Sequence, residues 1–383
     1  MALRVGTSTN SDASSAAREA VVAARSGCES PVFALVFATL DHRCEDIAAA
    51  VSASLGSIPW AGCSTPGLLT QVGFLRSGVA VGIIDAKAVK VGIGLSPLDA
   101  FSGREAGRVA ATAALASLPA PPTHRGRAMV LLCDSRDAAS TDVVRGASAV
   151  AGAGVAWAGG GTGATGVQFF NGKCHVHTAL AIAFDFPSRA GTGIHHGWVP
   201  FGPPAMITAA SGTVVRQLEY QNAFDTYRTI VEGSGESVTR ETFAAFSMAH
   251  PLGIPQATGE HLIRDPMLVE PDGSIRCAAE VPDGALVRVM RGTPDALIAA
   301  AGKAAELARD DTAGPLGGAF IFDCVSRFGV LGDAIDLELA AFKGAFGEGV
   351  PFLGCLSYGE VGAFGSCVPQ FHNKTAIVLG FPR

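Results

Sequence analysis

One arrangement of apolar segments occurs three times along the chain, and it constrains the fold more than any other feature. Each copy contains a buried strand, a helix, a strand that ends in glycine, a polar loop and a second buried strand. The tripeptide Trp-Ala-Gly recurs at residues 60–62 and 157–159. The expected elements are, in the first copy, 33–39, 46–55, 60–65 and 79–84; in the second, 129–134, a helical run, 157–162 and 178–184; and in the third, 319–324, 336–346, 352–355 and 375–381.

These copies predict an α/β (α+β) protein with mixed β-sheets flanked by helices. The glycine at the end of the middle strand permits a sharp backbone turn. The strands are continuously apolar rather than alternating, which is typical of strands covered on both faces. A further strand and helix precede the second and third copies, and Thr293 with Pro294 is a strong helix start. A turn-like break at 186–189 predicts two domains, residues 1–186 and 187–383.

Composition excludes several classes of protein. The formal net charge is −6 and no basic cluster is present, so the electrostatic requirement for binding nucleic acid is not met. The nine cysteines are scattered and none forms a Cys-x-x-Cys pair, which favours a reducing compartment. The longest apolar stretch contains Asp85, Lys87 and Lys90, which argues against membrane insertion. The N-terminal residues lack the apolar core of a signal peptide, so we expect a cytoplasmic protein.

A glycine-rich loop and a pair of histidines are the first candidates for a binding site. Gly161, Gly163 and Gly166 match the spacing of a dinucleotide fingerprint, but the following residues read as strand and turn instead of helix. His175 and His177 are expected on one face of a strand. The next histidine, His195, would lie roughly 13 Å away at about 3.3 Å per residue, which disfavours a shared metal. A single haem-ligating histidine and ordinary hydrogen-bonded histidines both remain open.

Polar residues near the C-terminus form the more informative set. Arg327 follows one buried strand, Tyr358 and Glu360 follow the next, and Asn373 opens the last. Ligand crevices in open α/β sheets lie at such strand ends. Arg327 and Glu360 either hold the carboxylate and ammonium of a ligand or form an ion pair that braces two loops. Cys324 lies at the same expected edge and completes the candidate ligand-binding set.

A cysteine-dependent enzyme is a further alternative. Cys324, Cys355 and Cys367 are candidate nucleophiles and His372 a candidate base. Cysteine is, however, commonly a small buried apolar residue, and the sequence has no Gly-x-Ser-x-Gly elbow. The sequence therefore favours a binding protein over an enzyme.

The ordered motifs of the whole chain resemble the FIST family, with an N-terminal FIST domain followed by a C-terminal one. The first domain carries the segments 36–38 and 61–67, the second of which reads Ala-Gly-Cys-Ser-Thr-Pro-Gly. The second domain carries a longer series: 196–202, 250–253, 259–260 with Arg264, Cys324-x-x-Arg327, Gly354, 358–361 and 372–375.

The resemblance implies a sensory protein that binds a small ligand, with amino acids proposed for the family. One subgroup resembles haem proteins that sense nitric oxide through a histidine, which makes His175 and His177 the haem candidates here. Many relatives are fused to receptor or kinase modules, so we expect this chain to act through a separate signalling partner.

Overall fold

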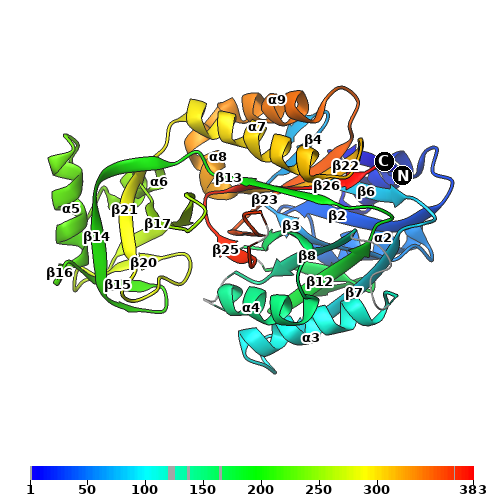
Figure 1. Ribbon diagram of the computed structural model, residues 1–383. Helices are drawn as coiled ribbons and strands as arrows, with labels where there is room; N and C mark the ends of the chain where they lie inside the picture. Colours follow the sequence, from blue (N-terminus) through cyan, green and yellow to red (C-terminus); the bar gives the residue numbers. More distant parts are fainter. Residues whose placement is uncertain (1, 120–125, 136–138, 164–165, 366) are drawn as a thin grey trace.

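The computed structural model describes residues 2–119, 126–135, 139–163, 166–365 and 367–383, and it has a large lobe and a small lobe (Figure 1). The large lobe contains three six-stranded sheets. The small lobe, residues 199–291, is an insertion between β13 and α7 of the large lobe. Both chain termini lie in the large lobe, far from the small one (Figure 1).

The large lobe is built from three structurally equivalent repeats, each with the order strand, helix, strand, helix, strand, hairpin, strand. Repeat 1 contains β1 (Ala2–Ser8), α1 (Ala13–Arg25), β2 (Pro31–Thr39), α2 (Cys44–Leu55), β3 (Trp60–Thr65), β4 (Leu68–Thr70), β5 (Gly73–Leu75) and β6 (Val79–Asp85). Repeat 2 contains β7 (Lys90–Pro97), α3 (Gly103–Ala116), β8 (Arg127–Cys133), α4 (Ser140–Ala151), β9 (Ala156–Gly161), β10 (Gln168–Phe170), β11 (Lys173–His175) and β12 (Thr178–Asp185). Repeat 3 contains β13 (Gly191–His195), α7 (Pro294–Asp311), β22 (Leu316–Cys324), α8 (Val325–Leu331), a 3-10 turn (Gly332–Ala334), α9 (Ile335–Phe346), β23 (Phe352–Ser357), β24 (Glu360–Gly362), β25 (Gln370–His372) and β26 (Ala376–Pro382).

The three repeats exchange their hairpins in a cycle. In every repeat the two central strands are parallel, as in β2–β3, and the returning strand is antiparallel, as in β2–β6. The hairpin of each repeat completes another repeat's sheet: β10–β11 pairs with β3, β24–β25 with β9, and β4–β5 with β23. This exchange ties residues from distant parts of the sequence into one body.

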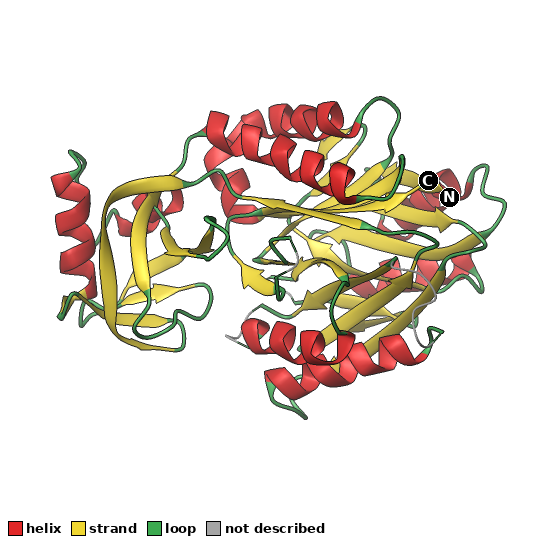
Figure 2. Ribbon diagram, viewed as in Figure 1, coloured by secondary structure: helices red, strands yellow, loops and turns green. Residues whose placement is uncertain are grey.

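The inner faces of the three sheets share a single apolar core. Phe37 of β2, Leu132 of β8 and Phe322 of β22 all belong to it, and the Phe37 and Phe322 rings meet edge to face at 6.0 Å. The outer face of each sheet is covered by its own helices and forms a separate cluster. Strands covered on both faces explain why their sequences are continuously apolar (Figure 2).

The small lobe is an antiparallel sheet with its own apolar core and short helices. Its elements are β14 (Val199–Ser211), β15 (Val214–Leu218), β16 (Gln221–Asn222), α5 (Ala223–Gly233), α6 (Phe243–Ala249), β17 (Leu252–Pro255), β18 (His261–Arg264), β19 (Pro266–Val269), β20 (Ile275–Cys277) and β21 (Leu286–Arg291). It meets the large lobe through charged contacts, including Arg145 with Glu280 at 2.7 Å and Lys374 with Asp265 at 2.9 Å.

The α/β class and the three repeated units predicted from the sequence are confirmed. The break at 186–189 falls between β12 and β13, where repeat 2 ends and repeat 3 begins. Two sheets nevertheless contain strands from both sides of this break, and the division into domains 1–186 and 187–383 stays a prediction. Of the helices in the described ranges, none has the length and apolar character needed to cross a membrane.

Candidate ligand site between the two lobes

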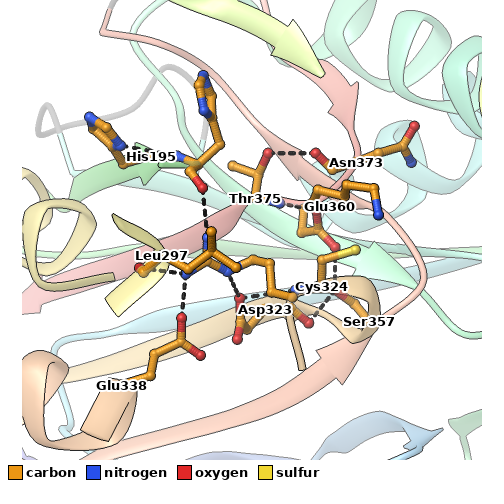
Figure 3. A network of polar contacts seen from close by, with 12 residues as sticks. His195, Leu297, Asp323, Cys324, Glu338, Ser357, Glu360, Asn373 and Thr375 are labelled. Carbon is orange, nitrogen blue, oxygen red and sulfur yellow. Dashed lines mark hydrogen bonds and ion pairs between the residues drawn. The ribbon is translucent and has the colours of Figure 1, made fainter. Parts of the chain in front are cut away.

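A cluster of buried charges lies at the end of β22, where the strand passes into α8 (Figure 3). Arg327 is fully buried, and its Nε donates to Asp323 Oδ1 at 2.7 Å. The spacing of four residues places Asp323, on the last strand turn, directly below Arg327 on the first turn of the helix. The Arg327 guanidinium also donates to the carbonyls of His196 and Leu297, each at 2.9 Å, and to the Glu338 carboxylate.

This cluster holds one proton between its two acids. Burial raises the pKa of Glu338 well above its ordinary value, against the opposing effect of Arg327. The outer oxygens, Asp323 Oδ2 and Glu338 Oε2, are buried and receive no donor from another described residue. A carboxyl proton on Glu338 directed at Asp323 satisfies both oxygens and leaves the charge of Arg327 balanced by one carboxylate.

Glu360 extends the network toward the last strand. Its carboxyl oxygens meet the Ser357 hydroxyl at 2.9 Å and the Thr375 backbone N–H at 3.1 Å. Burial raises the pKa of Glu360 well above its ordinary value, and Asp323 adds to the effect. Glu360 is therefore a neutral acid at pH 7, and it fixes the position of the segment that contains Asn373, whose carbonyl accepts from Thr375 Oγ1 at 2.9 Å.

A cavity of about 530 Å³ lies above this network, at the junction of the two lobes. Its size falls within the range of small-molecule sites. The large lobe contributes Ser135, Gly163, Cys324, Val325, Ser326, Tyr358, Gly359 and Asn373; the small lobe contributes Thr213, Asp265, Met267, Arg276, Cys277 and Ala278.

Asn373 gives the cavity an unsatisfied polar group. The residue is 3% exposed, it lines the cavity, and its Oδ1 has no hydrogen-bond partner within the described parts of the chain. A buried acceptor left without a donor costs about 1–3 kcal/mol. Burial also raises the pKa of Tyr358, so this half-buried phenol remains neutral beside the cavity. The cavity thus presents an acceptor that a bound donor would satisfy.

Asp265 closes the cavity from the small lobe. Its two oxygens meet Lys374 Nζ at 2.9 Å and the Ser326 hydroxyl at 2.7 Å. Lys374 also donates to the Met248 carbonyl at 3.0 Å and lies over the Trp198 ring. These contacts hold the small lobe against the strand ends of repeat 3 around the cavity.

A larger groove of about 1090 Å³ lies elsewhere between the lobes, lined by Trp157, Glu260 and others. Its charged side chains pair within the protein: Arg189 with Asp311 at 3.1 Å, and Glu260 with the His196 ring at 3.6 Å. The smaller cavity is the better candidate because it contains the orphaned acceptor.

The structure brings the predicted ligand residues together but separates them into two layers. Cys324, Tyr358 and Asn373 line the cavity. Arg327 and Glu360 lie in the buried network, where Arg327 pairs with Asp323 and Glu338, and Glu360 with Ser357 and Thr375.

The sequence analysis missed the residues that close the cavity from the small lobe, above all Asp265 and Arg276. The small lobe has no repeat and no recognisable site motif. The one available signal was Arg264, a member of the resemblance, because it precedes Asp265 directly.

The two histidines proposed as haem ligands are engaged with protein groups. His175 Nε2 lies 3.0 Å from the Phe170 carbonyl oxygen. His177 lies beyond the end of β11 with a φ of 54°, so the two side chains do not share a strand face as expected. Its Nε2 lies 3.2 Å from Asp99, and its Nδ1 3.9 Å from Asp134. Neither histidine lines the cavity or the groove, so these residues do not fit an axial haem ligand.

The candidate cysteine nucleophiles are placed in unfavourable surroundings for a thiolate. Burial raises the pKa of both Cys324 and Cys355. Burial also lowers the pKa of His372 to about 3, and its Nε2 faces the Gly362 carbonyl at 3.2 Å. A reactive cysteine needs the opposite shift. Cys367 is exposed and two of the residues masked from description lie at or near loops beside it, at 366 and 164–165 of the glycine loop.

Comparison with known families identifies the chain. Residues 32–221 match the FIST N domain and residues 223–363 match the FIST C domain. The chain belongs to the FIST family. FIST domains act in signal transduction as sensors that bind small ligands. The two matches meet within the small lobe, between β16 and α5, so the N-terminal match covers most of repeats 1 and 2 and the start of the small lobe.

Comparison with solved structures gives only distant similarities. A cyanuric acid hydrolase from A. caulinodans has 12% identity and a TM-score of 0.27, over 48% of this chain and 71% of that one. Phosphoribosylformylglycinamidine synthase II from Thermotoga maritima has 10% identity and a TM-score of 0.20, over 99% of this chain and 71% of that one. Neither score supports an argument about function. No curated protein matches the sequence.

Proposed function

We propose that this FIST protein is a cytoplasmic sensor that binds an amino-acid-like molecule in the cavity between its lobes and signals through a separate partner protein. The observation that carries the proposal is the buried, unpartnered Oδ1 of Asn373, which lines a cavity of about 530 Å³. A ligand with an N–H or O–H donor would remove the cost of this orphaned acceptor.

The polar groups around the cavity suit a ligand that carries both charges. Asn373 and Asp265 are acceptors and face the ammonium end in this proposal. Arg276 is the donor for a carboxylate, although in the free protein it pairs with Glu270 at 2.5 Å. The Tyr358 hydroxyl and Ser135 add adaptable hydrogen-bonding groups.

The position of the cavity suggests how binding would produce a signal. Its walls come from both lobes, so a ligand that contacts both stabilises one relative arrangement over others. The Lys374–Asp265 ion pair and the Ser326–Asp265 hydrogen bond lie at the same junction and would change with it. The partner would recognise the surface that this rearrangement alters.

The proposal is tested by thermal unfolding with the twenty proteinogenic L-amino acids as probes at millimolar concentration. A binding amino acid at about 100 times its Kd stabilises the folded protein by about 2.7 kcal/mol. Asn373→Leu removes the acceptor at similar volume and should abolish this stabilisation. Tyr358→Phe removes only one hydroxyl of a half-buried side chain, and should weaken it without a risk to folding.

Glu260→Gln is the matched control, because Glu260 lines the larger groove and not the cavity. It should leave the ligand response unchanged. The proposal fails if no amino acid stabilises the wild-type protein. It also fails if Glu260→Gln, rather than Tyr358→Phe, reduces the stabilisation.

A further inference from the structure

Two cysteines and a glutamate meet where the exchanged β10–β11 hairpin of repeat 2 packs on helix α2 of repeat 1. Cys44 and Glu45 are the first two residues of α2, and Cys174 lies in β11. One ligand atom from each of the three residues lies within 4.8 Å of the other two. Both cysteines are half-buried and Glu45 is exposed, so an ion can reach them from solvent.

Regular structure fixes the positions of the two thiols. Cys174 pairs across the hairpin with Phe169, and Phe169 pairs with Gly62 of β3. The hairpin turn lies beside the same helix, because a Cβ added to Gly172 would come within 2.8 Å of Ser52 Oγ. The hairpin is therefore held along α2, with Cys174 at the start of the helix and its turn farther along.

We propose that Cys44, Cys174 and Glu45 form a zinc-binding site. In a tetrahedral site with Zn–S bonds of about 2.3 Å and Zn–O bonds of about 2.1 Å, the sulfurs are about 3.8 Å apart and each lies about 3.6 Å from the oxygen. The separations of up to 4.8 Å found here need only a small side-chain adjustment to reach those values. Three protein ligands leave the fourth position for water.

The ligand types select the class of metal. Two thiolates favour zinc and other thiophilic ions, whereas calcium and magnesium require mostly oxygen ligands. His175, the neighbour of Cys174, directs Nε2 to the Phe170 carbonyl and is not needed as a ligand. Each cysteine releases its thiol proton to solvent as its sulfur binds the metal, so zinc uptake releases two protons and weakens as the pH falls.

The equivalent junction of repeat 3 indicates what the metal would do. There the β4–β5 hairpin of repeat 1 packs beside α9, and Arg76, just after β5, pairs with Asp333, just before α9, at 3.2 Å. An ion pair thus bridges one hairpin–helix junction of the large lobe. Zinc bound to Cys44 and Cys174 would bridge the junction between repeats 2 and 1 more firmly.

The test uses the full-length protein, reduced and freed of metal, with its thiols counted by alkylation. Zinc titration against a competing chromophoric chelator should show one equivalent bound tightly. Co²⁺ in its place should give sulfur-to-cobalt charge-transfer absorption and the strong visible bands of a tetrahedral site. Cys44→Ser and Cys174→Ser should each lose the site, and Glu45→Gln should weaken it at an exposed position that does not threaten folding.

Cys367→Ser is the control, since Cys367 is an exposed free thiol outside the cluster. It should bind zinc as the wild-type protein does. The inference is overturned if the fully reduced wild-type protein binds no stoichiometric zinc. It is equally overturned if Glu45→Gln and both cysteine variants bind zinc as tightly as the control.

Discussion

Replacing Arg327 with methionine should cost about 4 kcal/mol of unfolding free energy. Arg327 is fully buried and donates to two carboxyl groups and to the carbonyls of His196 and Leu297. Methionine fills much of the space but leaves these acceptors without a donor and an acid without its counter-charge. Removing one partner of a buried ion pair typically costs about 3–5 kcal/mol, a large part of the 5–15 kcal/mol that holds a domain folded.

Urea-induced unfolding at pH 7, followed by circular dichroism, measures this loss. Arg189→Met is the matched control, because Arg189 pairs with Asp311 in a half-exposed ion pair at 3.1 Å and should cost less than about 1 kcal/mol. Adding Asp323→Asn and Glu338→Gln to Arg327→Met removes the charges left unbalanced and should restore part of the stability. A loss below about 1 kcal/mol for Arg327→Met, or a triple variant no more stable than the single one, would refute the assignment of Arg327 to a structural cluster.

Two further substitutions test the network and the cavity wall. Burial raises the pKa of Glu360 in the folded protein above its unfolded value of 4.5, so the stability of the neutral form is fully present below that value and is lost as the pH rises, by up to about 1.4 kcal/mol per pH unit. Glu360→Gln should remove this contribution, and equal slopes of unfolding free energy between pH 5 and 8 for variant and wild type would contradict it. Gly163→Ala should cost about 1–3 kcal/mol and displace Tyr358, because its φ is +78° and the added Cβ would lie 2.0 Å from the Tyr358 ring. Gly152→Ala, with φ +80° and open space around its Cβ, is the control that carries the backbone cost alone, and equal losses in the two variants would disprove the contact.

Much of the large lobe could be predicted because its information is local. The repeated strand–helix–strand pattern and the Trp-Ala-Gly motifs mark segments whose two faces are both covered, and the apolar runs reveal this directly. The exchange of hairpins could not be predicted. β10 pairs with β3 across about a hundred residues, and no local pattern in a three-residue strand specifies such a partner.

The candidate site was predicted in part for the same reason. Cys324, Tyr358 and Asn373 follow strands of repeat 3, and the rule that strand ends meet at one edge located them. Arg327 and Glu360 follow the same strands, yet the sequence could not tell whether they face the cavity or the core. That choice depends on Glu338, which comes from α9, and on the small lobe, whose Asp265 has no sequence signal.

A crystal structure of the protein with the amino acid selected by the thermal screen tests the central claim most directly. The account predicts ligand density beside Asn373, with a donor atom of the ligand in hydrogen-bond contact with Oδ1 and its carboxylate near Arg276. Density in the groove beside Trp157 and Glu260, with Asn373 Oδ1 contacting only ordered water, would contradict it.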